Sequence, residues 1–342
     1  MNKKSGKPTL LDVAKAANLS ISTVSRTLSD NGYPVSEESR MSVLSAVEKV
    51  GYDLEHYKVS SRNKYKIALV IPNVLNPYYP RLISGVSNAC SKLKIDFVLF
   101  SSENNQQKEK QILNDIRVYD YSGVILVSIC NDYSHISRLL SLGVNLIICE
   151  QPINMKCSRI VFDYYSAGYL AAKFLVKRGN KKIAYISSPL TRPSRIDLFK
   201  GFTQGLSHCG LEMDKSLILI SDEELHLGEG IYEFENGRKQ IRKLINHAVL
   251  PDGIFCINDL TAIGSMKELE LYNFRIPDDI AIMGFDNILS SNLTNPPLTT
   301  IDQSAYQLGS MAVEMIINKL EDPNREEASM VLEPKIIVRE SV

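Results

Sequence analysis

The sequence predicts a small all-α helix-turn-helix headpiece followed by a larger α/β body made of two doubly wound, parallel-sheet halves. Two patterns predict this fold class. Between residues 9 and 50, apolar residues recur at helical spacing in three short segments separated by polar turns. From Lys66 onward, near-continuous apolar runs alternate with amphipathic stretches, which is typical of buried parallel strands joined by crossover helices.

Composition favours a globular protein without a membrane segment. The 342 residues are 44% hydrophobic and 23% charged, and no uninterrupted apolar run is long enough to span a membrane. The first ten residues, "MNKKSGKPTL", are charged and lead into no apolar signal sequence, so we expect a cytoplasmic location. The six cysteines form no CxxC pair and are interpreted as reduced, mostly buried thiols.

The zero net charge conceals an asymmetry between the two predicted parts. Residues 1–66 carry 11 Lys and Arg against 7 Asp and Glu, a net charge of +4, which leaves 28 against 32, or −4, in the remainder. A basic front end suggests an anionic partner, although a solvated tail can show the same difference.

Local signals define the helices of the headpiece. Thr9 stands three residues before Asp12, which is a capping signal, and apolar residues follow at helical spacing at Leu10, Val13, Ala14 and Ala17. Asn18 tolerates the left-handed backbone that ends a helix, and Ser20 can cap a second helix that runs through Leu28. A third helix begins after Ser36, and we expect it to close a small core with Val43, Leu44, Val47 and Val50.

The second helix carries the stretch "SISTVSRTLS", residues 20–29. Val24 and Leu28 face the core, whereas the opposite side presents Ile21, Ser22, Ser25 and Arg26. Short hydroxyl side chains allow a helix to approach a DNA backbone, and an arginine can form two hydrogen bonds with guanine. The alternative is a serine-rich surface helix without a ligand, which the preceding helix, the turn and the basic charge disfavour.

The headpiece resembles that of the lactose-repressor (LacI/GalR) family of bacterial transcription regulators. "TLLDVAKAANLSISTVSRTLS" meets nearly every fixed position of the family pattern T-x-x-DVA-x-x-A-x-VS-x-x-TVSR-x-L. The resemblance implies that double-stranded operator DNA is the partner. It places base-reading positions at Ile21, Ser22 and Arg26, and phosphate-contacting positions at Thr9, Ser20, Thr23, Ser25, Ser29 and Ser36.

The body contains two series of strand-like segments. The first consists of "KIALVIPN", "DFVLFSS", "GVILVS" and "NLIICEQ", and the second of "KKIAYISS", "LILISD", "GIFCIND" and "IAIMGFD". Two similar α/β halves of this kind bind a small ligand between them, at the carboxyl ends of their strands.

Polar and aromatic residues at these strand ends predict a ligand cleft. They are Tyr78, Tyr79, Asp163, Asn258, Asp259 and Asp286. Aromatic faces beside carboxylates suit a polyhydroxylated ligand, because the rings cover its apolar face and the carboxylates accept its hydroxyl protons. Each residue alone is better explained by a capping or turn role, whereas their shared position at strand ends favours a ligand site.

The body is similar to the family's periplasmic-binding-protein-like effector domain, so the resemblance covers nearly the whole chain. It implies effector positions at Tyr78, Tyr79, Asp163, Tyr232, Asn258 and Asp286. It also implies three crossings of the chain between the halves, near Gly179, Asp302 and Ala328. The expected domains are a headpiece at 1–52, a linker at 53–66 and an effector domain at 67–342, with an N-subdomain of 67–178 and 302–328 and a C-subdomain of 179–301 and 329–342.

Two segments depart from the family pattern. Leu198 occupies a position where many members carry an arginine that holds the effector, so either Arg195 or Arg192 replaces it or the effector needs no such arginine. The linker lacks the usual Pro-Asn, and Lys58 and Ser61 stand where the pattern has alanine and leucine. We therefore expect it to bind DNA phosphates by charge, with little kinking.

Two other classes of function compete with a regulator. A solute-binding sensor with no DNA role would fit the body but not the headpiece. An enzyme is disfavoured because no GxGxxG, GxxxxGK[ST], GxSxG or HExxH motif is present, and the five histidines form no ligand-spaced pair. We therefore expect a ligand-responsive repressor of carbohydrate or related metabolite genes that acts as a homodimer, with no catalytic residue, metal or cofactor. The expected effector is a sugar, a sugar phosphate or a similar polar metabolite.

Overall fold

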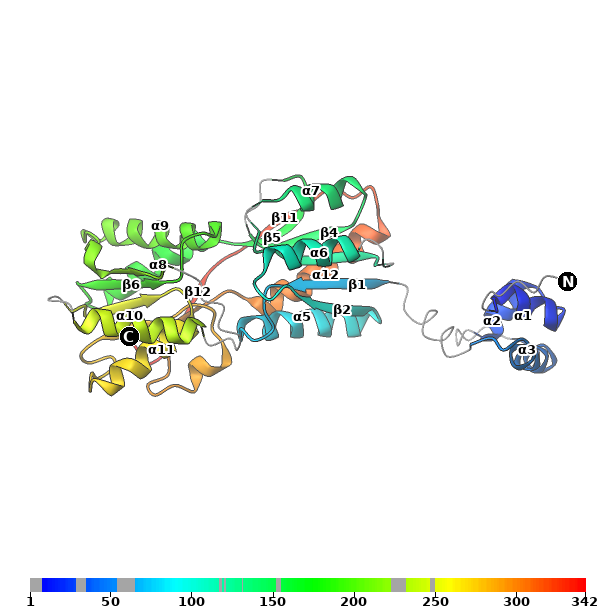
Figure 1. The fold of residues 1–342 in the computed structure, drawn as a ribbon, viewed down its shortest axis with the longest axis horizontal. Helices are drawn as coiled ribbons and strands as arrows, with labels where there is room; N and C mark the ends of the chain where they lie inside the picture. Colours follow the sequence, from blue (N-terminus) through cyan, green and yellow to red (C-terminus); the bar gives the residue numbers. More distant parts are fainter. Residues whose placement is uncertain are drawn as a thin grey trace. The chain divides into compact units, whose positions relative to one another are not determined.

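The structure is a computed structural model that describes residues 8–28, 35–53, 65–116, 119, 121–130, 132–151, 155–222, 232–246 and 250–342. These residues form two units, a helical headpiece whose unit ends at Tyr65 and a body that begins at Lys66 (Figure 1). Most of the expected linker, residues 54–64, lies outside the described residues. Within the described ranges, no helix has the length and apolar character needed to cross a membrane.

Three helices form the headpiece: α1 (Leu10–Ala17), α2 (Ile21–Leu28) and α3 (Glu37–Val50). The predicted start and end of α1 are confirmed, because Thr9 and Asp12 form a reciprocal capping box and Asn18 adopts the left-handed backbone with φ 54°. The predicted Ser36 cap of α3 is confirmed as well. The three helices enclose a core of Val13, Ala14, Ala17, Val24, Leu28, Val43, Ala46 and Val47.

The expectation for Leu44 was wrong, because its side chain is 43% exposed. Ala46 is buried instead, since positions 43, 46, 47 and 50 form one stripe of α3 and position 44 lies beside that stripe.

The first half of the body is built on a six-stranded sheet in the order β11-β5-β4-β3-β1-β2. Its strands are β1 (Lys66–Ile71), β2 (Asp96–Ser101), β3 (Gly123–Val127), β4 (Leu146–Glu150), β5 (Ser158–Phe162) and β11 (Ser329–Leu332). The pairs β1–β3, β3–β4, β4–β5 and β5–β11 are parallel. The helices of this half are α5 (Tyr78–Leu93), α6 (Gln106–Ile116), α7 (Ser134–Ser141) and α12 (Ala305–Glu321).

The second half is built on a four-stranded parallel sheet in the order β7-β6-β8-β9. Its elements are β6 (Ile183–Ser187), β7 (Ile218–Ile220), β8 (Gly253–Cys256) and β9 (Ala281–Met283), with α8 (Tyr164–Lys177), α9 (Pro193–His208), α10 (Tyr232–Ile245) and α11 (Asp259–Leu271). Short 3-10 turns occupy Lys215–Leu217 and Leu289–Asn292. The eight strands predicted for the two halves are thus confirmed.

Strand periodicity explains why helices cover both faces of this second sheet. Tyr185 and Phe255 pack into one core with α8 and α9, whereas Ile186 and Cys256, each the next residue along its strand, pack into another core with α10 and α11. Successive strand side chains point to opposite faces, so near-continuous apolar strands require a helical layer on each side.

The chain crosses three times between the halves, and two crossings correct the expected boundaries. The first lies at Asp163 rather than near Gly179, because α8 packs against α9 of the second half. Another lies after Leu332 rather than near Ala328, because β11 pairs with β5 in the first sheet. The remaining crossing lies between β10 (Thr300–Asp302) and the start of α12 at Ala305, close to the expected Asp302. There β10 pairs in an antiparallel ribbon with β12 (Lys335–Ile337), which belongs to the last crossing.

Candidate functional site

A cavity of about 470 Å³ lies in the body, at the carboxyl ends of strands from both sheets. The first half contributes the segments that follow β1, β2 and β4, and the second half contributes those that follow β6, β8 and β9. Parallel strands bring their carboxyl ends to the same edge, so side chains distant in sequence meet there. The lining residues are Asn73, Leu75, Asn76, Tyr78, Tyr79, Glu103, Asn104, Asn105, Glu150, Gln151, Tyr164, Arg192, Ser194, Arg195, Leu198, Tyr232, Glu233, Ile257, Asn258, Phe285, Asp286 and Gln303.

Glu150, the last residue of β4, places a buried carboxylate on the wall of the cavity. Its backbone has φ 70°, a left-handed conformation that costs free energy in a residue other than glycine. Burial raises the pKa of this carboxyl to about 7, against the opposing effects of the nearby Tyr78 hydroxyl and Arg192. Glu150 Oε1 and the Tyr78 hydroxyl have no hydrogen-bond partner of good geometry among the described residues, so both can serve a ligand.

Asp286 provides a second buried carboxylate, contributed by the segment after β9. It accepts a hydrogen bond from Gln303 Nε2, and Gln303 Oε1 accepts one from the Tyr164 hydroxyl at 3.1 Å. Burial, and next the charge of Asp259, raise the pKa of Asp286. Its φ of 121° again lies in the left-handed region.

Asp259 holds in place the loop that carries Asp286. Its fully buried carboxylate accepts hydrogen bonds from Ile288 N at 2.9 Å, Ser291 Oγ at 2.6 Å and Thr300 Oγ1 at 2.5 Å. These bonds connect the start of α11 to three points beyond β9. The sequence reasoning included Asp259 among the strand-end residues, and the structure gives it this supporting position away from the cavity lining.

Aromatic rings and two arginines complete the wall. The rings of Tyr78 and Tyr79 meet edge-on at 5.2 Å between centroids, and those of Tyr164 and Phe285 are stacked at 6.0 Å. Arg192 and Arg195 both line the cavity near Leu198, and Arg195 Nη1 donates to Pro189 O at 3.0 Å.

Six of the seven predicted effector residues line this cavity: Tyr78, Tyr79, Arg195, Tyr232, Asn258 and Asp286. The structure differs at Asp163, which is not among the lining residues. Its carboxylate caps α8 by accepting a hydrogen bond from Ser166 N at 2.9 Å, and the next residue, Tyr164, reaches the cavity instead.

The sequence reasoning missed Glu150, Gln151 and Gln303. The first two end the strand segment "NLIICEQ", so the strand-end rule that selected Asp286 would also have found them. Gln303 lies in a connection between the halves, and no local pattern marks it.

The headpiece presents the predicted base-reading residues on the outer side of α2. Ile21, Ser22 and Arg26 are exposed, whereas Val24 and Leu28 are buried. This arrangement gives α2 one apolar face for the core and one polar face for a partner.

Three of the predicted phosphate-contacting residues stand at helix N-termini. Thr9 caps α1, Ser36 caps α3, and Ser20 Oγ accepts a hydrogen bond from Thr23 N at 3.1 Å at the start of α2. Helix N-termini favour anions, because their first backbone N–H groups have no partner within the helix. Thr23 and Ser25 are half-buried in α2, and Ser29 lies outside the described residues.

Comparisons with known proteins identify both parts. The family model described as bacterial regulatory proteins, lacI family, matches residues 9–53, and that of the periplasmic binding protein-like domain matches residues 172–342. The chain belongs to the LacI family. This LacI-family protein is therefore a DNA-binding transcription repressor that responds to an effector, and not an enzyme.

Relatives match the LacI-family chain over almost its whole length. The HTH-type transcriptional repressor PurR of Mannheimia succiniciproducens is 29% identical, with 98% of each chain covered. The ribose operon repressor of Halalkalibacterium halodurans is also 29% identical, over 97% of this chain and 96% of that protein.

Solved structures show the same fold. The transcriptional regulator CelR in its cellobiose complex superposes with a TM-score of 0.72 at 25% identity, covering 98% of this chain and 100% of that chain. The Lac repressor dimer bound to operator and the anti-inducer ONPF has a TM-score of 0.80 at 20% identity, covering 98% of this chain and 99% of that chain.

Proposed function

We propose that the effector of this repressor is an uncharged sugar or similar polyol that fills the cavity of the body. The observation that carries this proposal is the pair of buried carboxylates, Glu150 and Asp286, both of which line the cavity. Carboxylate oxygens accept hydrogen bonds, and sugar hydroxyls are the donors they need. The neighbouring rings of Tyr78 and Phe285 offer faces for the C–H surface of a sugar ring.

The charge of the lining favours a neutral ligand over a phosphorylated one. Four carboxylates line the cavity, from Glu103, Glu150, Glu233 and Asp286, against the guanidinium groups of Arg192 and Arg195. Burial already raises the pKa of Glu150 and Asp286, so negative charge is disfavoured in this cavity, and a phosphate would add about two more negative charges. Two of the similar proteins support the neutral class by their names alone, because one is named a ribose operon repressor and one was solved with cellobiose.

We propose further that the repressor binds a two-fold symmetric operator as a homodimer in the cytoplasm. α2 is a single eight-residue helix and can reach only a few base pairs. Two headpieces on adjacent half-sites supply the contacts that high affinity requires. On this proposal Ile21, Ser22 and Arg26 read bases, while Thr9, Ser20, Thr23, Ser25, Ser29 and Ser36 contact phosphates.

The effector proposal is tested by calorimetry with a panel of neutral sugars, their phosphates and amines. We expect a neutral sugar to bind and Asp286→Asn to weaken that sugar by roughly 10- to 100-fold, equivalent to about 1–3 kcal/mol for a buried hydrogen bond. Asp163→Asn is the matched control, because asparagine can still cap α8 and this side chain does not line the cavity. Preference for a sugar phosphate, or equal loss in both variants, would refute the proposal.

The DNA proposal is tested with an operator selected from genomic fragments by the wild-type protein. Arg26→Ala should cost roughly 1–3 kcal/mol per half-site and relax the preference at one base pair. Ser25→Ala should weaken all sequences about equally. An Arg26→Ala variant that keeps the wild-type operator preference would remove this residue from base reading.

A further inference from the structure

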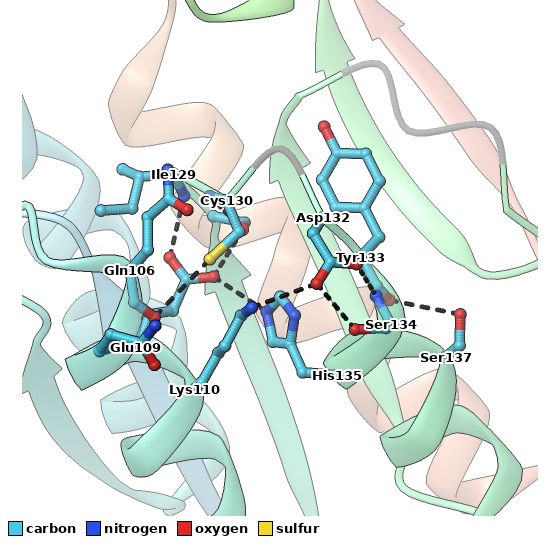
Figure 2. Close-up of polar contacts among 12 residues, drawn as sticks. Gln106, Glu109, Lys110, Ile129, Cys130, Asp132, Tyr133, Ser134, His135 and Ser137 are labelled. Carbon is cyan, nitrogen blue, oxygen red and sulfur yellow. Dashed lines mark hydrogen bonds and ion pairs between the residues drawn. The ribbon is translucent and has the colours of Figure 1, made fainter.

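A second cluster of chemically reactive side chains lies in the first half of the body, and none of its members lines the effector cavity. It joins Glu109 of α6, Cys130 after β3 and His135 of α7 (Figure 2). One carboxylate oxygen, one sulfur and one ring nitrogen all lie within 4.8 Å of one another. These are the three donor types that proteins use to bind transition metals.

We propose that this cluster binds a divalent transition-metal cation of the Zn²⁺ class. His135 Nε2 and Glu109 Oε1 are 3.3 Å apart, which matches the edge of a tetrahedral site with bonds of about 2.0 Å. Cys130 Sγ lies within 4.8 Å of both atoms, and its bond to zinc, about 2.3 Å, is the longest of the three. A thiol and an imidazole exclude Mg²⁺ and Ca²⁺, which take oxygen ligands.

The carboxylate of the site is already oriented by its neighbours. Glu109 Oε1 accepts a hydrogen bond from Ser128 Oγ at 2.6 Å. Its Oε2 accepts one from Ile129 N at 2.9 Å (Figure 2). Metal sites depend on such outer contacts, because they fix the direction of the ligand and limit the entropy lost on binding. The Cys130 thiol donates a weak hydrogen bond, 3.8 Å long, to the backbone oxygen of Gln106, the first residue of α6.

The histidine of the cluster is almost buried and contacts Glu109 through Nε2. Its side chain is only 9% exposed, and Nδ1 has no partner among the described residues. With a metal at Nε2, Nδ1 keeps its hydrogen and supplies no ligand, so the site rests on the approach of the three donor atoms to one another. The neighbouring Asp132 does not enter the proposed ligand set, because it accepts hydrogen bonds from Ser134 N and Lys110 Nζ. A water molecule then completes the four-coordinate site.

The sequence reasoning expected no metal because no two histidines have ligand spacing. The proposed ligands come from three separate elements, and Glu109 and His135 are 26 residues apart. Only the folded sheet brings them together. Metal at this position would connect α6 and α7 to the end of β3.

The test uses the full-length protein, stripped of metal and titrated with Co²⁺ as a spectroscopic probe. We expect one Co²⁺ per chain, an absorption band from thiolate-to-cobalt charge transfer, and displacement of Co²⁺ by Zn²⁺. Cys130→Ser should abolish the thiolate band, and His135→Gln should weaken binding by more than about 100-fold. Cys209→Ser is the control, because half-exposed Cys209 stands next to His208 and is a rival binding point on the surface.

Two results would overturn the proposal. One is a wild-type spectrum without thiolate ligation, which does not depend on whether any variant folds. The other is loss of the band in Cys209→Ser with retention in Cys130→Ser, which would assign the metal to the surface pair.

Discussion

Glu150 shows what a single buried carboxylate does to the molecule. Its pKa is raised to about 7 by burial, whereas the ordinary value is 4.5. The folded state therefore holds the proton more tightly than the unfolded state between these two values. Stability contributed by this group is greatest below pH 4.5, falls as the pH rises, and is lowest above pH 7.

We predict that Glu150→Gln removes this pH dependence. The variant should gain stability relative to the wild type as the pH is raised from 5 to 8, by up to about 3 kcal/mol, because glutamine has no charge to bury. Urea unfolding at several pH values measures the difference. Glu103→Gln alters an exposed acid of the same cavity, so its free energy of unfolding relative to the wild type should not change with pH. If the free energies of unfolding of the wild type and Glu150→Gln differed by the same amount at every pH, Glu150 would not be the source of the pH dependence.

At this residue scale, sequence could predict positions that follow a strand but not those placed by long-range connections. Asn258 and Asp286 lie just after β8 and β9, and Tyr78 begins the helix that follows β1, so parallel topology alone brings them to one edge. Gln303 reaches Asp286 only because the chain crosses between the halves there. Asp163 has the same strand-end position as Asp286, but its carboxylate caps the helix that begins at the next residue.

At the scale of elements, close helix pairs are the main packing device of the body. In the pair α5–α12, a Cβ added at Gly85 would lie 2.0 Å from the Tyr306 carbonyl oxygen, and one at Gly309 would lie 2.3 Å from the Leu82 carbonyl oxygen. Two backbones approach this closely only where both helices lack a side chain at the contact. Each helix of the pair therefore fixes the position of the other.

We predict that Gly85→Ala lowers the free energy of unfolding by roughly 1–3 kcal/mol, because the helices must separate. Alanine is the better helix former by about 1 kcal/mol, so helix propensity alone would give the opposite sign. Chemical denaturation measures the change. Ser87→Ala, on the exposed side of the same helix, should stay within about 0.5 kcal/mol of the wild type. A Gly85→Ala variant more stable than the wild type would show that α5 and α12 accommodate the added methyl group without separating.

Apolar periodicity predicted the type and order of the elements well, because each strand run and each amphipathic stretch is local. One of these amphipathic stretches, "YYPRLISGVSNACSKL", forms α5. Assignment of elements to halves was less successful. α8 and β11 were placed in the wrong half, since their partners, α9 and β5, are determined by tertiary packing and not by their own sequence.

Across the whole body, neither half is continuous in sequence. The first half ends with β11, and the second half ends with a segment whose Ser341 Oγ donates to Ile282 O at 2.6 Å and accepts from Thr299 N at 2.8 Å. Three connections cross between the halves, so strain in one half is transmitted to the other. The body is thus expected to unfold as one cooperative unit.

We predict coincident unfolding of the two halves. The sequence contains no tryptophan, so Phe100→Trp and Phe274→Trp, made separately, report on the first and second half through residues packed at their cores. The urea midpoints of the two tryptophan variants should agree. Introducing Ser341→Ala into each variant should lower both midpoints by an equal amount, corresponding to about 1–3 kcal/mol for the lost buried hydrogen bonds. Separate midpoints, or an effect of Ser341→Ala on the second half alone, would show independent subdomains.

The pairing of β5 with β11 has a consequence during synthesis on the ribosome. Arg159 and its strand neighbour Ser329 are 170 positions apart, so β5 emerges long before the strand that covers its edge. Until then the nascent chain presents an unpaired, apolar strand edge, which is a template for association with other chains. Slow translation or a stall before residue 329 would therefore prolong a state that needs chaperone protection.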